Sequence, residues 1–154
     1  MNAPSRLRPT VVTPDRAQSI KPFGLDMKVM LSSEATGGAL SILTGWLKPG
    51  EGPSDHYHLD RDEVFFIVEG TIELTVGGNT STIGAGSVAL IPRGTAHRFR
   101  NVGDTTACLL DLTLPGGQDH FFKAISELAA SGGFTGEKAT EIARQFDTNF
   151  VASS

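Results

Sequence analysis

The chain has 154 residues and a net charge of −4. It is long enough for one domain with a real core, and it has no basic stripe, so no nucleic-acid partner is expected. No apolar run has the length of a membrane span, and residues 1–20 lack the apolar stretch of a signal peptide, so no membrane partner is expected. Cys108 is the single cysteine, which excludes an intrachain disulfide. Together these features predict a soluble cytoplasmic protein.

Residues 1–19 are rich in proline, serine, arginine and threonine, and we expect them to form a flexible N-terminal arm. From residue 20 to 114, short apolar segments alternate with glycine-containing turns. This pattern is typical of an antiparallel β-sandwich or barrel, and it predicts an all-β domain. Strands are expected at residues 27–32, 40–47, 64–68, 72–76, 81–83, 87–91, 97–101 and 107–113.

The segment 115–154 has a different pattern and is expected to be a helical extension of the same domain. Apolar residues recur near helical spacing within 119–130, and Ser131-Gly132-Gly133 ends that helix. A second helix is expected at about 137–146, with Thr135 as its N-cap. We expect both helices to pack on the barrel.

The clearest chemical signal is the pair His56 and His58. Two histidines at positions i and i+2 share one face of a strand, whereas in a helix they would point in different directions. The next four residues can reverse the chain and bring Glu63 opposite the pair, and a turn at 92–94 precedes His97. Three imidazoles and one carboxylate suit a divalent transition metal and leave positions open, as catalysis requires.

A single histidine on a strand is more often a polar surface residue than a metal ligand. Here three of the four histidines fall in one pattern with a carboxylate at hairpin distance, which favours a metal site. The fourth, His120, has no partner by spacing and is interpreted as a surface residue.

Two longer motifs contain these residues. In the first, Gly50, His56, His58, Glu63 and Gly70 are separated by five, one, four and six residues. In the second, Gly86, Pro92, Gly94, His97 and Asn101 are separated by five, one, two and three residues. The fifteen residues between them complete a pattern that resembles the compact single-barrel cupin family. The resemblance implies an antiparallel jelly-roll β-barrel with the following metal ligands: His56, His58, Glu63 and His97.

The tail carries a second resemblance. Pro115-Gly116-Gly117 followed by Phe121-Phe122 resembles the small quercetin-dioxygenase-like cupins, in which this segment packs across the barrel near the pocket. Such a tail could close the barrel end or act as a substrate lid. The family often forms dimers through outer sheet faces and N-terminal strands, which implies a homodimer; the alternation at 25–31 fits such an exchange or an ordinary edge strand equally well.

Strand alternation predicts which side chains accompany the ligands inside the barrel. Phe65 and Ile67 fall on the face of Glu63, and Phe99 falls on the face of the last histidine ligand. Trp46 can join them from an adjoining strand, but alternation does not fix its face. An apolar, aromatic-lined site suits a small planar aromatic substrate. Alternatively, these side chains only fill the core of the barrel.

The resemblance implies a metal-dependent dioxygenase like the quercetinases, with Glu63 as ligand and catalytic proton acceptor. Two alternatives remain open: a metal-assisted cyclase, isomerase or decarboxylase that needs no oxygen, and a non-catalytic small-ligand-binding module. The cofactor is expected to be one divalent transition metal, Fe, Ni, Mn, Co, Cu or Zn, with iron or nickel favoured for oxygen chemistry.

Overall fold

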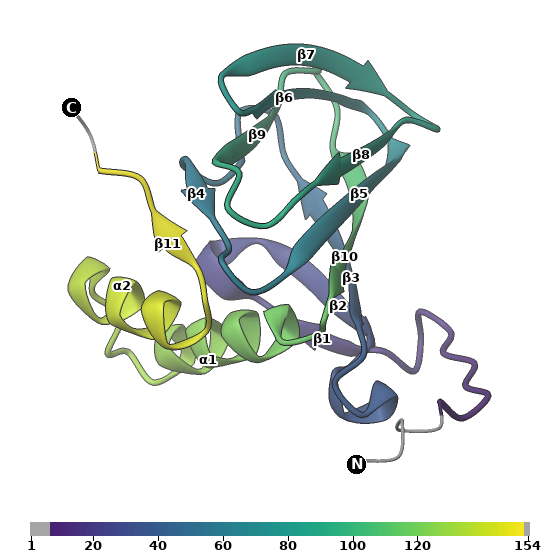
Figure 1. Cartoon of the computed structure of the whole chain (residues 1–154), viewed down its shortest axis with the longest axis vertical. Helices are drawn as coiled ribbons and strands as arrows, with labels where there is room; N and C mark the ends of the chain where they lie inside the picture. Colours follow the sequence, from purple (N-terminus) through teal and green to yellow (C-terminus); the bar gives the residue numbers. More distant parts are fainter. Residues whose placement is uncertain (1–6, 153–154) are drawn as a thin grey trace.

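The computed structural model describes residues 7–152, in which the strands form a barrel with two helices at one end (Figure 1). The elements, with η for 3₁₀ turns, are β1 (Gln18–Ile20), η1 (Pro22–Gly24), β2 (Asp26–Leu31), η2 (Glu34–Thr36), β3 (Ser41–Leu47), β4 (His56–Tyr57), β5 (Asp62–Glu69), β6 (Thr71–Val76), β7 (Asn79–Gly84), β8 (Val88–Ile91), β9 (His97–Asn101), β10 (Ala107–Leu114), α1 (Gln118–Ala130), α2 (Gly136–Gln145) and β11 (Asn149–Phe150). Each expected strand and helix is present within about two residues of its expected bounds.

Two antiparallel sheets form the walls of the barrel. The six-stranded sheet has the order β1-β2-β3-β10-β5-β8, and the five-stranded sheet has the order β11-β4-β9-β6-β7. The short strands β1 and β11 were not expected, and each extends one edge of a sheet. The prediction of an all-β antiparallel jelly-roll barrel with a helical tail is confirmed.

The N-terminal arm was expected to cover residues 1–19. Residues 1–6 lie outside the described part of the chain, and 7–17 contain no helix or strand. The arm ends at β1, where Gln18 pairs with Val29 and Ile20 pairs with Met27 of β2. Its flexibility, and the boundaries of the three segments, stay predictions.

The interior of the barrel is divided along the strands into an apolar part and a polar part. On β5 the buried positions alternate as Glu63, Phe65 and Ile67, so one strand passes from a carboxylate to the apolar core. On β10 the buried Thr113 pairs with Glu63, and the buried Asp111 pairs with Phe65. The polar part therefore lies at one end of the barrel, beside the helices.

Asn101 shows why the second motif ends on an asparagine. Its Nδ2 donates to the carbonyl oxygens of Leu47 and Thr105, each at 2.8 Å, and its Oδ1 accepts from the N–H of Gly103 at 2.9 Å. The buried side chain thus satisfies three backbone groups where β9 ends. Gly70 of the first motif has φ +92°, and a Cβ there would lie 2.6 Å from the Cβ of Ala107.

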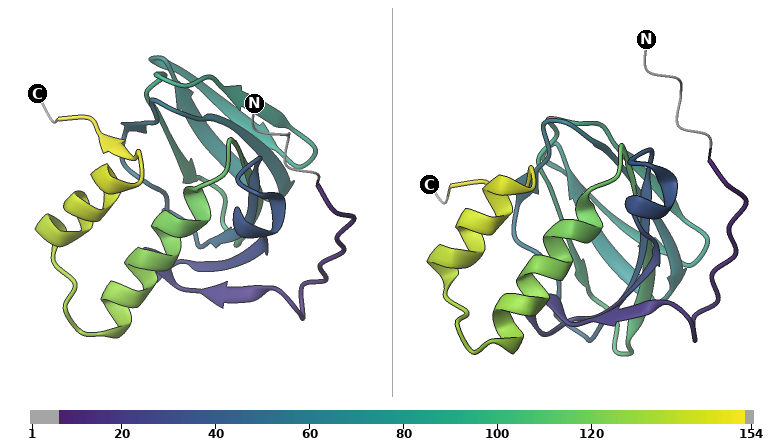
Figure 2. Two further views of the ribbon diagram at one scale, coloured as in Figure 1. Left: turned by 60° about the horizontal axis from the view of Figure 1, so that its bottom comes forward. Right: turned by 90° about the horizontal axis from the view of Figure 1, so that it is seen from below.

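The helices α1 and α2 lie side by side across the polar end of the barrel (Figure 2). They pack on each other through one apolar cluster, Phe121, Ile125, Ala139 and Ala143. Thr135 caps α2 as predicted, because its Oγ1 accepts a hydrogen bond from the N–H of Lys138 at 3.2 Å. None of the helices in residues 7–152 has the length and apolar character that crossing a membrane would need.

Candidate metal centre and adjoining cavity

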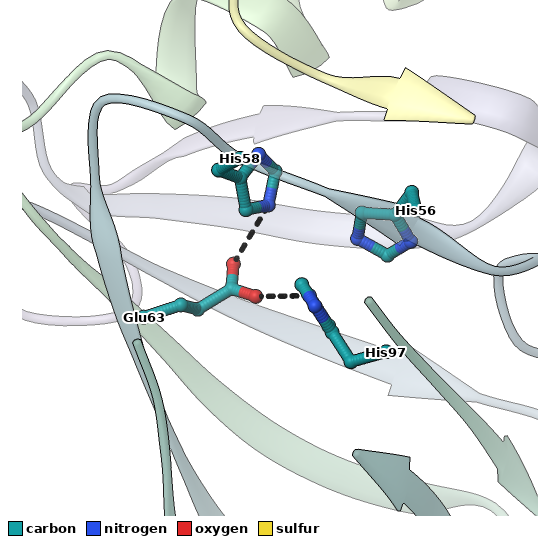
Figure 3. A group of neighbouring side chains, drawn as sticks. All are labelled: His56, His58, Glu63 and His97. Carbon is teal, nitrogen blue, oxygen red and sulfur yellow. Dashed lines mark hydrogen bonds and ion pairs between the residues drawn. The ribbon is translucent and has the colours of Figure 1, made fainter. Parts of the chain in front are cut away.

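The four predicted ligands come together inside the barrel from three strands. His56 lies on β4, His58 directly follows it, Glu63 lies on β5, and His97 begins β9. One ligand atom from each lies within 4.8 Å of the others, and all four side chains are buried. Figure 3 shows the imidazoles of His58 and His97 directed at the two carboxylate oxygens of Glu63, with His56 beside them. The four side chains converge as predicted, but the expected β-hairpin is wrong. β4 pairs with β9 and β11, whereas β5 pairs with β10 and β8, so Glu63 approaches the histidines from the other sheet.

The contacts at the centre are short. His97 Nε2 lies 2.8 Å from Glu63 Oε1, and His58 Nε2 lies 3.8 Å from Glu63 Oε2. The ring centroids of His56 and His97 are 4.3 Å apart, and their backbones pair directly across β4 and β9. Three imidazoles therefore surround one carboxylate within the distances that a single ion can bridge.

Backbone carbonyl groups fix the tautomer of all three histidines. His56 Nδ1 donates to the carbonyl of Ser54 at 2.8 Å, and His97 Nδ1 donates to that of Thr95 at 2.9 Å. His58 Nδ1 donates to the carbonyl of Asp147 at 2.7 Å. A carbonyl can only accept, so each Nδ1 carries the proton and each Nε2 presents its lone pair to the centre. This is the arrangement that metal-ligating histidines adopt.

His58 provides a direct test of whether these residues fit a metal ion. Its Nε2 is fully buried and has no hydrogen-bond partner among the described residues. At the neighbouring ligand, the Nε2 lone pair of His97 faces a carboxylate oxygen of Glu63, and two acceptors at that distance need a proton or a cation between them. The donor set therefore fits a divalent transition metal.

The surroundings also set the charges of the ligands. Burial, followed by the neighbouring His97, lowers the pKa of His56 to about 4, so this imidazole is neutral at pH 7. Burial alone would raise the pKa of Glu63, but the neighbouring imidazoles of His58 and His97 outweigh it and hold that pKa far below its ordinary value. Conversely, burial lowers the pKa of His97, but the Glu63 carboxylate outweighs it and raises that pKa. The centre thus combines an anion with a neutral imidazole, the states that bind metal.

A residue from the C-terminal segment supports the ligands, although no sequence pattern indicated this role. The carboxylate of Asp147 accepts hydrogen bonds from the backbone N–H groups of Leu59 at 2.7 Å and Asp60 at 2.9 Å. It also lies 3.5 Å from Nε of Arg61, whose side chain is buried. With its carbonyl bonded to His58, Asp147 holds the whole turn between His58 and β5.

A cavity of about 420 Å³ adjoins the centre and is bordered by His56 and Glu63. Three of the four predicted substrate-binding residues, Trp46, Phe65 and Phe99, line it. Ile67 does not border this cavity, because it lies further along β5 in the apolar core. Further aromatic lining that the sequence did not predict comes from η1, α1 and β11: Phe23, Phe121, Phe122 and Phe150. The tail therefore forms part of the cavity wall.

Three buried polar side chains also line the cavity, and none of them was predicted: Asp111, Gln118 and Thr148. Burial, followed by the charge of Glu63 and a hydrogen bond with it, raises the pKa of Asp111 well above its usual range. A sequence signal existed for Asp111, since an aspartate in the middle of the apolar strand ACLLDLTL requires a polar environment.

Residues 46–113 match the family model for the cupin domain. The chain is 36% identical over 104 residues to the polyketide synthase protein CurC of Streptomyces cyaneus, covering 66% of this chain and 67% of CurC. It is 31% identical over 99 residues to quercetin 2,3-dioxygenase of Bacillus subtilis, covering 63% of this chain but only 28% of that protein. Among solved structures, KdgF from Halomonas sp. superposes with a TM-score of 0.64 at 18% identity, covering 72% of this chain and 99% of KdgF.

The barrel, the two motifs and these relatives together show that the chain belongs to the cupin family. The match to KdgF supports the fold alone, because the sequence identity is low.

Proposed function

We propose that His56, His58, Glu63 and His97 hold one divalent transition metal, and that the protein is a metal-dependent enzyme acting on a small, planar, enolisable aromatic molecule. The observation that carries the proposal is the shared tautomer of the three histidines, which leaves their Nε2 atoms available to a metal ion beside the Glu63 carboxylate and an aromatic cavity. A structural zinc site needs no adjoining cavity, and a metal that takes five or six ligands would keep open positions beside these four protein ligands.

A bound divalent metal would polarise an enol or phenol oxygen of such a molecule and favour its ionised form. The chain supplies the rest of the chemistry. Glu63 borders the cavity and, as an anion, can accept the proton from that oxygen at Oε2, the carboxylate oxygen further from its histidine partner. Phe65 and Phe99, whose ring centroids lie 4.9 Å apart, would contact the aromatic body and exclude water.

Two reactions can follow from this activated substrate. The first is oxidative cleavage by a quercetinase-like dioxygenase, with iron or nickel as the expected metal; similarity to quercetin 2,3-dioxygenase supports it. The second is a non-oxidative cyclisation, isomerisation or decarboxylation of a polyketide-like molecule, and the longer match to CurC supports it. Both use an enolisable aromatic substrate, and they differ in their need for oxygen.

Turnover of a panel of flavonols and aromatic polyketide analogues, in air and under anaerobic conditions, tests the proposal. Protein loaded in turn with Fe, Ni, Mn, Co, Cu and Zn should convert at least one compound. Glu63→Gln should lower kcat by about 100-fold or more, the usual contribution of a general base. Glu69→Gln, an exposed glutamate on the same strand, is the matched control and should leave kcat unchanged.

Loss of turnover without air would identify the dioxygenase, whereas anaerobic turnover would identify the non-oxidative enzyme. Stoichiometric binding without product for every metal and compound would contradict catalysis and leave a ligand-binding module. An equal kcat for Glu63→Gln and the wild type would contradict the role of Glu63.

We also propose that the protein is a homodimer. The outer face of the six-stranded sheet carries cross-strand neighbours that are apolar and wholly or partly exposed: Ile42, Val64, Phe66, Val68, Val88, Leu90, Leu110 and Leu112. Val88 and Leu90, each 65% exposed, lie on the edge strand β8. A contiguous apolar face of this kind is typical of a subunit interface.

A further inference from the structure

Two side chains that line the cavity have buried polar atoms without a hydrogen-bond partner. Within residues 7–152, Oδ1 of Asp111 and Oγ1 of Thr148 are in this state, together with only one other buried side-chain atom, Nε2 of His58. Asp111 is 5% exposed and Thr148 is 2% exposed. Buried polar groups almost always find a partner. Since the third atom belongs to the proposed metal centre, the first two indicate a ligand of their own.

Asp111 and Thr148 reach the cavity from different parts of the fold. Asp111 lies in the middle of β10 and pairs with Phe65, one inward position from Thr113, which pairs with Glu63. Thr148 immediately precedes β11, and its N–H donates to the carbonyl of Ala143 at 2.8 Å. The sheet fixes the first residue and α2 anchors the second, so both polar atoms are held in place before any ligand binds.

The nearest cation does not satisfy Asp111. Arg61 acts on this carboxyl by its charge, but each of its side-chain nitrogens has another partner. Nη1 donates to Gln118 Oε1 at 3.1 Å, Nη2 donates to the carbonyl of Phe146 at 2.6 Å, and Nε faces Asp147. The guanidinium is therefore occupied by other partners and leaves Oδ1 of Asp111 free for a ligand.

We propose that Asp111 and Thr148 bind the oxygen substituents of the substrate and select for them. Asp111 Oδ1 accepts a hydrogen bond from a phenolic or enolic hydroxyl, and Thr148 Oγ1 donates one to a carbonyl oxygen. The substrate class is then a planar aromatic molecule that carries both a hydroxyl and a carbonyl group. This inference rests on the proposed function, since it names the substrate class of the same cavity.

A pair of probes separates the hydroxyl contact from the rest of the binding energy. Flavone has the carbonyl group, and 3-hydroxyflavone adds one hydroxyl to the same skeleton. Trp46 lines the cavity and is the only tryptophan, so quenching of its fluorescence reports binding without turnover. Zinc-loaded wild type is expected to bind 3-hydroxyflavone more tightly than flavone, and metal-free protein shows how much of that preference is independent of the metal.

Asp111→Leu keeps the branching of the side chain and removes both oxygens. It should reduce the preference for 3-hydroxyflavone by about tenfold, in metal-free as well as zinc-loaded protein, because one hydrogen bond to the hydroxyl is lost. Flavone should bind as well as before. Asp111→Asn retains a carbonyl acceptor and should keep most of the preference, which distinguishes lost hydrogen bonding from altered packing.

Thr148→Val removes the hydroxyl at nearly constant volume and should weaken both probes by about tenfold, because both carry the carbonyl group. Thr148→Ser should restore binding. The matched control is Thr82→Val, the same change at an exposed position of β7. If Asp111→Leu does not fold, the valine and serine variants of Thr148 still test the proposal.

The outcomes are separable. Wild-type affinities for both probes in folded Asp111→Leu and Thr148→Val would overturn this inference alone, and would mean that ordered water satisfies the two atoms. Failure of wild-type protein to bind either probe, zinc-loaded or metal-free, would overturn the aromatic substrate class and this inference with it.

Discussion

Replacing Asp147 by alanine tests how far the C-terminal segment supports the metal ligands. Its carboxylate accepts two backbone hydrogen bonds from the turn that follows His58, at 2.7 and 2.9 Å, and its carbonyl accepts one from His58 itself. Asp147 also lies two residues before β11, which pairs with β4, the strand that carries His56. Loosening Asp147 should therefore affect both the fold and the metal centre.

The magnitude follows from the contacts that are lost. A hydrogen bond to a charged group contributes about 1.5–3 kcal/mol, and the lower value applies because the Asp147 side chain is 12% exposed. Asp147→Ala should thus lower the free energy of unfolding of metal-free protein by about 3 kcal/mol for the two bonds. The backbone φ of +54° adds to the loss, because alanine tolerates this region less well than aspartate or asparagine.

The metal affinity should fall as well. Partners of metal-ligating histidines typically contribute about 10–100-fold to affinity, so zinc binding by Asp147→Ala should weaken within that range. Urea unfolding of metal-free protein and zinc competition with a chromophoric chelator measure the two effects. Asp147→Asn keeps one acceptor oxygen and the backbone preference, and it should lose about half as much stability.

Asp104→Ala is the matched control, because Asp104 is exposed and has no hydrogen bond or ion pair within residues 7–152. If Asp147→Ala unfolds at the same urea concentration as the wild type and binds zinc equally tightly, the proposed support of the centre by the tail is wrong.

Three further changes test other parts of the structure. Burial raises the pKa of Asp119, but hydrogen bonds from Ser33 outweigh this effect and hold that pKa below its ordinary value of 3.8. Asp119→Asn should therefore lower the free energy of unfolding by about 1–2 kcal/mol at pH 7, and this loss should begin to shrink as pH falls below about 4 and vanish once pH lies below the lowered pKa. A pH-independent difference in urea unfolding would contradict this. Leu90→Lys should convert the dimer into a monomer of 16.3 kDa, measured by light scattering. The control Val11→Lys also replaces an exposed apolar residue by lysine and should leave the dimer intact. A wild-type monomer would refute the interface. Ile125→Ala should destabilise the chain by about 2–5 kcal/mol in urea, since Ile125 is fully buried between α1 and α2, and a loss under about 1 kcal/mol would mean that the helices are loosely packed.

Much of the barrel was predictable because each strand has its own local signal. Alternating apolar residues and glycine turns located the strands, and the spacing of His56 and His58 indicated that both side chains share one face. No local signal showed that β4 pairs with β9, and not with β5 as in the expected hairpin. Local periodicity was therefore enough to locate the strands, whereas the jelly-roll topology and the convergence of all four ligands were predicted by the resemblance to cupins.

Other features depend on the path of the chain through space. β11 is two residues long and pairs with β4 because α2 places it there, so no local sequence pattern predicts this strand. The hydrogen bond between Asp147 and His58 is unpredictable for the same reason. Alternation assigned Ile67 to the inner face correctly but could not tell how far along the barrel it lies, and it borders the core and not the cavity. The face of a residue follows from sequence, whereas its depth follows from packing.

The most direct test of the account is the coordination of the metal in protein loaded with zinc or nickel, measured by X-ray absorption together with elemental analysis. We predict one metal per chain, bound by three imidazole nitrogens and a carboxylate oxygen at about 2.0–2.2 Å, with at least one imidazole lost in His58→Ala. No retained cation at neutral pH, or an absorption spectrum without imidazole ligands, would contradict the central claim.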